Sequence, residues 1–138
     1  MNTRVQNTSE LFEVLRTLRT EWPSRGWSWD TRLSCVASSI PVELAGQART
    51  AALHALPHAW NEKSLARAPR SIQDIAEQTG GVREDQLLMA RQSADGVLAY
   101  GLWWPWRNQI TISFRLGLFG RVSSRLEMDL MNQFDAYL

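Results

Sequence analysis

The chain has 138 residues, of which 44% are apolar and 21% are charged, and its formal net charge is +1. This length predicts one domain, residues 1–138, that buries its own core without disulfides or metals. The near balance of charges argues against a polyanionic partner, because nucleic-acid-binding domains usually carry a concentrated basic excess. Fourteen of the fifteen basic residues are arginines, a bias that we attribute to a GC-rich and most simply bacterial coding source.

Cysteine usage and hydropathy predict a cytoplasmic protein. The single cysteine, Cys35, cannot form an internal disulfide, and its small and apolar neighbours predict a buried, unreactive thiol. Residues 1–10 are polar and lack the apolar core of a signal peptide. No stretch approaches the roughly 20 apolar residues that span a bilayer. We therefore expect no membrane partner.

The first predicted helix begins near Asn7, which can cap it, and Glu10 completes a capping box three residues later. Apolar residues then recur on one helical face until Pro23 ends the helix. These residues are Leu11, Leu15, Leu18 and Trp22. Residues 23–30 follow as a loop, whose tryptophans we expect to fold back onto the core.

The middle of the chain contains one ambiguous segment and two further helices. Residues 30–40 fit either a short helix or a strand, because short apolar runs are compatible with both. Pro41 suits the first turn of a helix that Pro57 kinks or ends. Another short helix begins at Ser71 and is closed by Gly80-Gly81.

The second half of the chain changes to the period of strands. Residues 87–92 and 97–104 predict two strands, joined at residues 93–96 by a turn that ends in Asp-Gly. Residues 109–118 alternate cleanly between an apolar and a polar face. The apolar face consists of Ile110, Ile112, Phe114, Leu116 and Leu118. A last helix begins with the capping box Ser124–Glu127. It presents Leu126, Leu130, Phe134 and Leu138.

These elements predict an α+β fold, in which N-terminal helices and one C-terminal helix pack on a small, about three-stranded antiparallel sheet. We expect the last two strands to pair around a turn at residues 105–108. The resulting pairs are Trp103 with Ile110, Gly101 with Ile112 and Ala99 with Phe114. Small residues then meet large ones on the inner face, as a packed core requires.

The same register places an apolar and aromatic stripe on the outer face of the sheet. Its residues are Leu98, Tyr100, Leu102 and Trp104. Either a helix of this chain covers the stripe, most simply the C-terminal helix, or a partner protein does. Trp106 and Arg107 follow at the hairpin tip, where tryptophans beside an arginine resemble the composition of interface hot spots. We assign Trp103 to the core.

The leading functional hypothesis is a small bacterial protein-binding module of the adaptor, secretion-chaperone or immunity-protein type. Its partner would be another protein or a second copy of itself, bound through the outer face of the sheet. The expected contact residues are Leu98, Tyr100, Leu102, Trp104, Trp106, Arg107 and Arg115. The sequence indicates no cofactor, no metal and no catalytic set.

One alternative is DNA binding. Residues 71–88 loosely resemble a helix-turn-helix unit with one residue inserted at Gly81, followed by a hairpin as in winged-helix proteins. The recognition helix would then begin at Arg83, and the carboxylates of Glu84 and Asp85 would face phosphates unfavourably. We therefore rank nucleic acid below protein as a partner.

A second alternative is a small enzyme that uses His54 and His58. Their spacing of four places both rings on one face of a helix, the arrangement of two metal ligands or of a general base with a neighbour. Pro57 distorts that face, however, and no cysteine or carboxylate pattern completes a ligand set. We do not expect catalysis.

Overall fold

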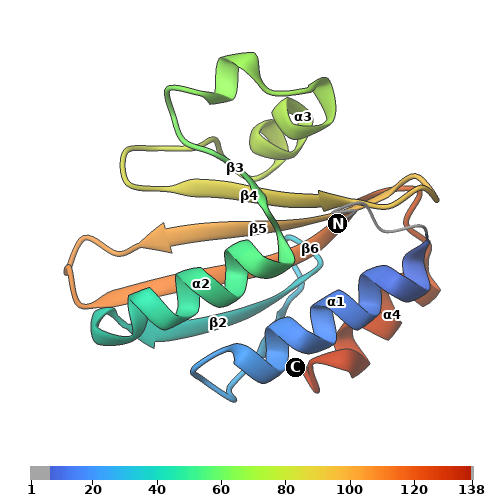
Figure 1. Ribbon diagram of the computed structural model, residues 1–138, viewed down its shortest axis with the longest axis horizontal. Coiled ribbons are helices and arrows are strands. Elements are labelled where there is room, and N and C mark those ends of the chain that lie inside the picture. The colour runs from blue at the N-terminus through green and yellow to red at the C-terminus, as the bar shows by residue number, and fades with distance from the viewer. Residues whose placement is uncertain (1–6, 138) are drawn as a thin grey trace.

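The computed structural model describes residues 7–137, and its α-helices and strands confirm the predicted α+β class. In chain order the elements are α1 (Thr8–Glu21), β1 (Ser28–Asp30), β2 (Cys35–Pro41), η1 (Val42–Leu44), α2 (Ala45–Ala55), β3 (His58–Trp60), η2 (Leu65–Arg67), α3 (Arg70–Gln78), β4 (Leu87–Gln92), β5 (Val97–Pro105), β6 (Thr111–Gly120) and α4 (Ser124–Gln133). Here η1 and η2 are short 3-10 helices. Figure 1 shows the helices arranged about one twisted sheet.

The sheet has six antiparallel strands in the order β1-β2-β6-β5-β4-β3, and is therefore larger than the roughly three strands expected. Residues 30–40, which fit either a helix or a strand, contain all of the strand β2 except its last residue, Pro41. This strand pairs along its length with β6, for example Val36 with Leu116. Local sequence leaves such a short segment undecided, and the distant partner strand supplies the hydrogen bonds that settle it. The edge strands β1 and β3 are too short to give a strong sequence signal.

Helices α1, α2 and α4 cover one face of the sheet and enclose the larger core (Figure 1). Helix α1 begins as predicted, because the side chain of Asn7 accepts a hydrogen bond of 2.9 Å from the amide of Glu10. The predicted apolar residues of α1 are all buried in this core. Trp27 also folds back, and its ring lies 4.6 Å from that of Phe134. Trp103 is buried here as expected.

The register between β5 and β6 differs from the prediction by four residues, since Trp103 lies opposite Phe114 and not Ile110. The turn lies further along the chain, because Trp106 still pairs through its amide with the carbonyl of Thr111. The side chain of Asn108 then accepts from the two amides that follow Gln109, which has a φ of 64°. An Asx turn of this kind favours the later position.

The shift of the register is an even number, so every strand residue keeps its predicted face. Ile110 is the exception, because it falls in the turn before β6 begins at Thr111. It was predicted to point into the core, but 61% of its surface is exposed. Gly101 still makes room for a large neighbour: an added Cβ would lie 2.7 Å from the ring of Phe114.

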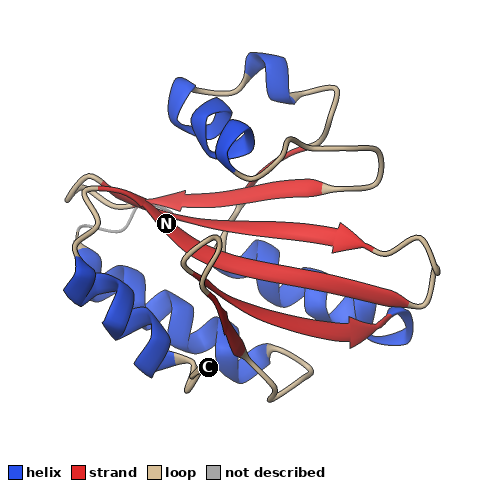
Figure 2. Ribbon diagram, turned by 180° about the vertical axis from the view of Figure 1, so that it is seen from behind, coloured by secondary structure: helices blue, strands red, loops and turns tan. Residues whose placement is uncertain are grey.

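Helix α3 packs on the opposite face of the sheet, where it forms a second and smaller core (Figure 2). Its buried residues are Ile72, Ile75 and Ala76. They share this core with Leu88, Ala90, Leu98, Tyr100 and Leu102. The expectation that the C-terminal helix covers this face is wrong. Helix α4 instead buries Leu130 and Phe134 in the larger core.

The N-cap residue of helix α4 is Ser123, one residue earlier than the predicted Ser124. The hydroxyl of Ser123, rather than that of Ser124, accepts a hydrogen bond of 3.2 Å from the amide of Leu126. Leu130 and Phe134 are buried as predicted, while Leu138 lies outside the described residues.

Candidate protein-binding site

The structure divides the predicted contact residues into a buried group and an accessible group. Leu98, Tyr100 and Leu102 are 7%, 6% and 1% exposed, because α3 and its flanking segments lie over them. Three members of the predicted stripe are therefore core residues of this chain. Trp104 is half-buried and packs against the same small core, Arg115 is half-buried on β6, and Trp106 and Arg107 are exposed where β5 turns into β6.

Arg115 and Trp104 form the ordered part of this accessible region. The guanidinium carbon of Arg115 lies 4.8 Å from the centre of the Trp104 ring, a cation–π contact. The Nε of the same guanidinium lies 3.1 Å from Oδ2 of Asp30, and one of its Nη groups donates to the hydroxyl of Ser113. Arg115 thus packs against one face of the Trp104 ring, and its charge is paired with that of Asp30.

Contacts with Arg115 and with nearby backbone amides stabilise the ionised carboxylate form of Asp30. Burial raises its pKa, but hydrogen bonds from Arg115 and from the amides of Leu33 and Arg32 outweigh burial and place the pKa below its usual value. The ion pair therefore persists at neutral pH. It ties the β1–β2 turn to the middle of β6, which keeps the outer face of these strands in one shape.

Apolar side chains gather at the end of the sheet where β5 turns into β6. Trp106, Ile110 and Val42 are 50%, 61% and 41% exposed, and they make up three of the five strongly exposed large apolar residues among residues 7–137. The amide of Val42 donates a hydrogen bond of 2.9 Å to the carbonyl of Ile110, which brings η1 against the turn. We call Val42, Trp106 and Ile110 the sheet-end surface.

Two hollows meet at Trp106. The first lies on the outer face of the sheet, has a volume of about 540 Å³ and is called here the outer-face hollow. Its lining includes Ala37, Ser39, Trp104, Trp106, Ser113 and Arg115. The second lies on the α2 side, has a volume of about 860 Å³ and is lined by both basic and acidic side chains. These include Arg49, Lys63, Glu84 and Asp85.

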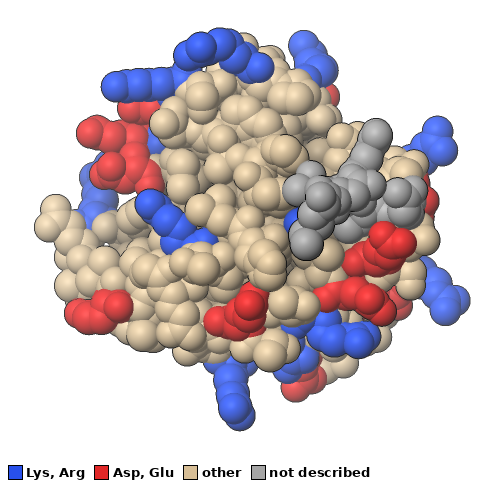
Figure 3. Space-filling model, in the orientation of Figure 1, with Lys and Arg blue, Asp and Glu red and all other residues tan. Residues whose placement is uncertain are grey.

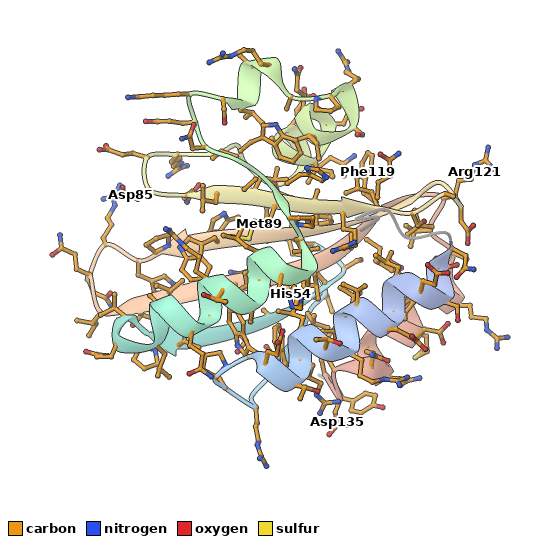
Figure 4. All side chains as sticks on the ribbon, in the orientation of Figure 1. His54, Asp85, Met89, Phe119, Arg121 and Asp135 are labelled. Carbon is orange, nitrogen blue, oxygen red and sulfur yellow. The ribbon has the colours of Figure 1, made fainter. Side chains whose placement is uncertain are left out.

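The second hollow has no dominant charge, because cations and carboxylates both line it. Arg49 lies over the Trp103 ring, with 5.3 Å from its guanidinium carbon to the ring centre. Figure 4 shows Asp85 at the same end of the sheet. On the molecular face seen in Figure 3, basic and acidic side chains are likewise interspersed. This distribution does not resemble the basic stripe of a nucleic-acid-binding surface.

The helix-turn-helix resemblance of residues 71–88 does not hold in the structure. Helix α3 ends at Gln78, and Gly80 and Gly81 follow with φ values of 94° and 86°. A tight turn then closes between Arg83 and Gln86, whose side chain accepts from the amide of Arg83 at 2.9 Å. Strand β4 begins immediately afterwards, so no recognition helix forms in this segment.

The two histidines lie on different elements, because Pro57 ends α2 between them. His54 is exposed on α2, with Nδ1 3.2 Å from Oε1 of Glu21 (Figure 4). His58 is exposed on the edge strand β3. The hollow beside His54 is lined by residues of α1 and α2 and not by His58. Among residues 7–137, no group of three His, Cys, Asp or Glu side chains is placed to hold a metal ion.

Cys35 is buried on the outer face of β2, as predicted. Desolvation by burial, together with the nearby charge of Asp30, raises the pKa of its thiol to about 12. A thiol is a nucleophile only as the thiolate, and this one is almost entirely protonated at neutral pH.

Val42 and Ile110 belong to the exposed surface but were not identified from the sequence. Ile110 continues the alternation of the following strand, so its period predicts a core position. The sequence signal that marks Ile110 as a turn residue, and not as a core residue of the strand, is Asn108. Its carboxamide favours an Asx turn that ends just before the strand.

No protein-family model, curated protein or solved structure matches this chain. Between residues 7 and 137, no helix has the length and apolar character needed to cross a bilayer.

Proposed function

We propose that this chain is a small protein-binding module, of the adaptor, secretion-chaperone or immunity-protein type, that contacts its partner through the sheet-end surface and the adjoining outer-face hollow. The observation that carries the proposal is the gathering of Val42, Trp106 and Ile110 at one end of the sheet. Exposed apolar residues scattered singly are normal, whereas a group of them that includes a tryptophan is typical of an interface.

The energy available at this surface is sufficient for a hot spot. A tryptophan side chain presents about 200 Å², so the exposed half of Trp106 offers about 100 Å². At about 25 cal/mol per Å², its burial contributes about 2.5 kcal/mol, close to two orders of magnitude in affinity. Arg107 is exposed in the turn and supplies a charged rim.

Contact through side chains fits this sheet better than the addition of a strand to its edge. Both edge strands, β1 and β3, have three residues, and short edge strands are a common protection against edge-to-edge pairing. The accessible surface lies instead where three longer neighbouring strands meet, at the ends of β2 and β5 and the start of β6. A partner bound there would touch the tip of the β5–β6 hairpin and the outer face beside it.

The proposal is tested by selecting peptides from a random displayed library on the wild-type chain. The double variant Trp106→Ala/Ile110→Ala serves as the counter-target, and Met128→Ala, which removes an exposed apolar side chain from α4, serves as the matched control. We expect enriched peptides to bind the wild type and Met128→Ala equally well. They should bind the double variant at least about tenfold more weakly.

Two results would overturn the proposal. One is the absence of any enriched peptide whose binding depends on Trp106 or Ile110. The other is a chain that forms a stable dimer in light scattering at micromolar concentration and keeps that dimer in the double variant, because self-association would then use a different surface.

A further inference from the structure

A chain of side-chain contacts crosses the outer face of the sheet, from β5 through β6 to the edge strand β1. Arg115 of β6 is its centre. The guanidinium carbon of Arg115 lies 4.8 Å from the centre of the Trp104 ring on β5, and its Nε lies 3.1 Å from Oδ2 of Asp30 on β1. We call these three residues the cross-sheet bridge. Among the described residues, Trp104 and Arg115 line the outer-face hollow, whereas Asp30 does not.

The register of the strands explains how Arg115 reaches β1 across the strand between them. Ala37 of β2 lies opposite Arg115 on one side and opposite Ser28 of β1 on the other. Asp30 is two residues from Ser28, so its side chain projects from the same face. The alanine side chain ends at Cβ and leaves room for the arginine to pass over β2. A short residue in the middle strand thus permits a contact between residues two strands apart.

Two hydrogen bonds fix the orientation of the guanidinium against the Trp104 ring. One goes from Nε of Arg115 to Asp30, and the other from an Nη group to the hydroxyl of Ser113. Because the guanidinium is planar and its donors point in fixed directions, two such bonds determine its plane. The side chains of Arg115 and Asp30 are 22% and 16% exposed, so water and salt weaken the ion pair less than one at the surface. Loss of the carboxylate would therefore leave the guanidinium plane held at one point only.

The two carboxylate oxygens of Asp30 have separate partners. Oδ1 accepts from the amides of Arg32 and Leu33, at 2.9 and 3.3 Å, and these bonds close the turn that follows β1. Oδ2 accepts from Arg115. The local turn and the cross-sheet bridge therefore depend on different atoms of one side chain, and a substitution can remove the bridge while it keeps the turn.

We infer that Asp30 is a positioning residue for the outer-face hollow, which acts through Arg115 to hold the Trp104 ring in the conformation that a bound partner contacts. This inference rests on the proposed function, because it concerns the same site. It assigns a role in binding to a residue that does not line the hollow. A side chain that is already ordered costs less entropy on association than one that must be immobilised by the partner.

The variant that tests this role is Asp30→Asn. Its carboxamide oxygen can still accept from the two turn amides, whereas the NH₂ group that replaces Oδ2 cannot accept from Arg115. The matched control is Asp74→Asn on α3, which removes an ion pair with Arg70 that has the same N–O distance of 3.1 Å.

The first measurement is ¹⁵N relaxation of the indole N–H groups in the full chain without any partner. The signals of Trp103 and Trp104 are assigned from the single variants Trp103→Phe and Trp104→Phe. We expect an order parameter of about 0.85 for the Trp104 indole in the wild type and in Asp74→Asn, and about 0.6 or less in Asp30→Asn. The indole of the buried Trp103 should stay ordered in all three chains, which separates loss of positioning from a general loosening of the fold.

The second measurement is the affinity of the peptide that is most enriched on the wild type in the displayed-library selection described above. Asp30→Asn should weaken its binding by about threefold to tenfold, the cost of ordering one freed side chain, while Asp74→Asn should bind like the wild type. Arg115→Met removes the guanidinium and should have the same effect. In that background Asp30→Asn should change the affinity no further, because Asp30 acts only through Arg115.

Three results would overturn the inference and leave the protein-binding proposal in place. The first is a Trp104 indole that is as ordered in Asp30→Asn as in the wild type. The second is a loss of this order without any loss of peptide affinity. The third is a weakening by Asp30→Asn that persists in the Arg115→Met background. A selection that enriches no peptide dependent on Trp106 or Ile110 would instead overturn the proposed function, and this inference with it.

Discussion

Replacing Tyr100 and Trp106 separately by alanine tests whether the outer face is divided between core and contact surface. Tyr100 is 6% exposed beneath α3, while Trp106 is 50% exposed at the sheet end. Aromatic-to-alanine changes in cores cost about 3–5 kcal/mol, part of it from the cavity that remains. The free energy of unfolding should therefore fall by about 3–4 kcal/mol in Tyr100→Ala and by less than about 1 kcal/mol in Trp106→Ala.

We expect Tyr100→Ala to fall in the lower part of the range for core aromatic residues, because the hydroxyl of Tyr100 contributes little to the free energy of unfolding. Among residues 7–137 it has no hydrogen-bond partner, so no polar contact is lost with the side chain. Its removal costs the burial of the ring and the contacts with the small core around α3. The conservative variant Tyr100→Phe keeps the ring, and should change the free energy of unfolding by less than about 1 kcal/mol.

The assay is equilibrium unfolding in urea, followed by tryptophan fluorescence and by far-ultraviolet circular dichroism. A domain of this size has a total stability of about 5–15 kcal/mol, so a loss of 3–4 kcal/mol is large and easily measured. Equal midpoints for the two alanine variants would contradict the division of this face into core and contact surface. So would a Tyr100→Ala variant as stable as the wild type, because Tyr100 would then not be covered by α3.

Three further changes test other parts of the structure. Gly117→Ala would place a Cβ 2.5 Å from the hydroxyl of Tyr100, so it should lower the free energy of unfolding by about 1–3 kcal/mol in urea. Burial raises the pKa of the Cys35 thiol to about 12. Because the unfolded thiol loses its proton first, stability should fall by about 1 kcal/mol as the pH rises to about 9.5. Asp95 accepts from the amide and hydroxyl of Thr8, both at 2.8 Å, and these bonds lower the pKa of its carboxyl. Protection of the Thr8 amide from hydrogen exchange should therefore disappear in Asp95→Ala, and in the wild type as the pH falls through that lowered pKa.

Each of these changes has a control in the same chain. Gly46→Ala adds a Cβ with nothing within 4 Å on helix α2, and should raise stability by roughly 0.5–1 kcal/mol, unlike Gly117→Ala. Cys35→Ala should remove the loss of stability near pH 9.5; an unchanged pH profile would assign that loss to other groups. Equal exchange of the Thr8 amide with and without the Asp95 carboxylate would contradict the third expectation.

The local elements of this fold are predictable from the sequence where a short-range interaction determines them. Asn7 caps α1, Pro57 ends α2, and the turn ending in Asp95-Gly96 joins β4 to β5, all as predicted. In each case the deciding atoms lie within a few residues of one another. The periodicity of α1 likewise predicts the residues that it buries.

Elements that depend on distant partners were missed or misplaced. The segment Cys35–Pro41 becomes a strand because β6, far along the chain, pairs with it. The register of β5 and β6 shifted because the side chain of Asn108 stabilises a later turn than the spacing suggested. Ile110 moved from the predicted core to the surface as a direct result.

The candidate site shows the same division. Alternation in a strand is a local property, so the sequence alone predicts that Leu98, Tyr100, Leu102 and Trp104 share one face of the sheet. The burial of the first three beneath α3, with Trp104 half-buried at the same core, follows from tertiary packing. That burial depends on how the segment between β3 and β4 folds back over the sheet, a packing of residues far apart in the chain whose energy no local pattern contains.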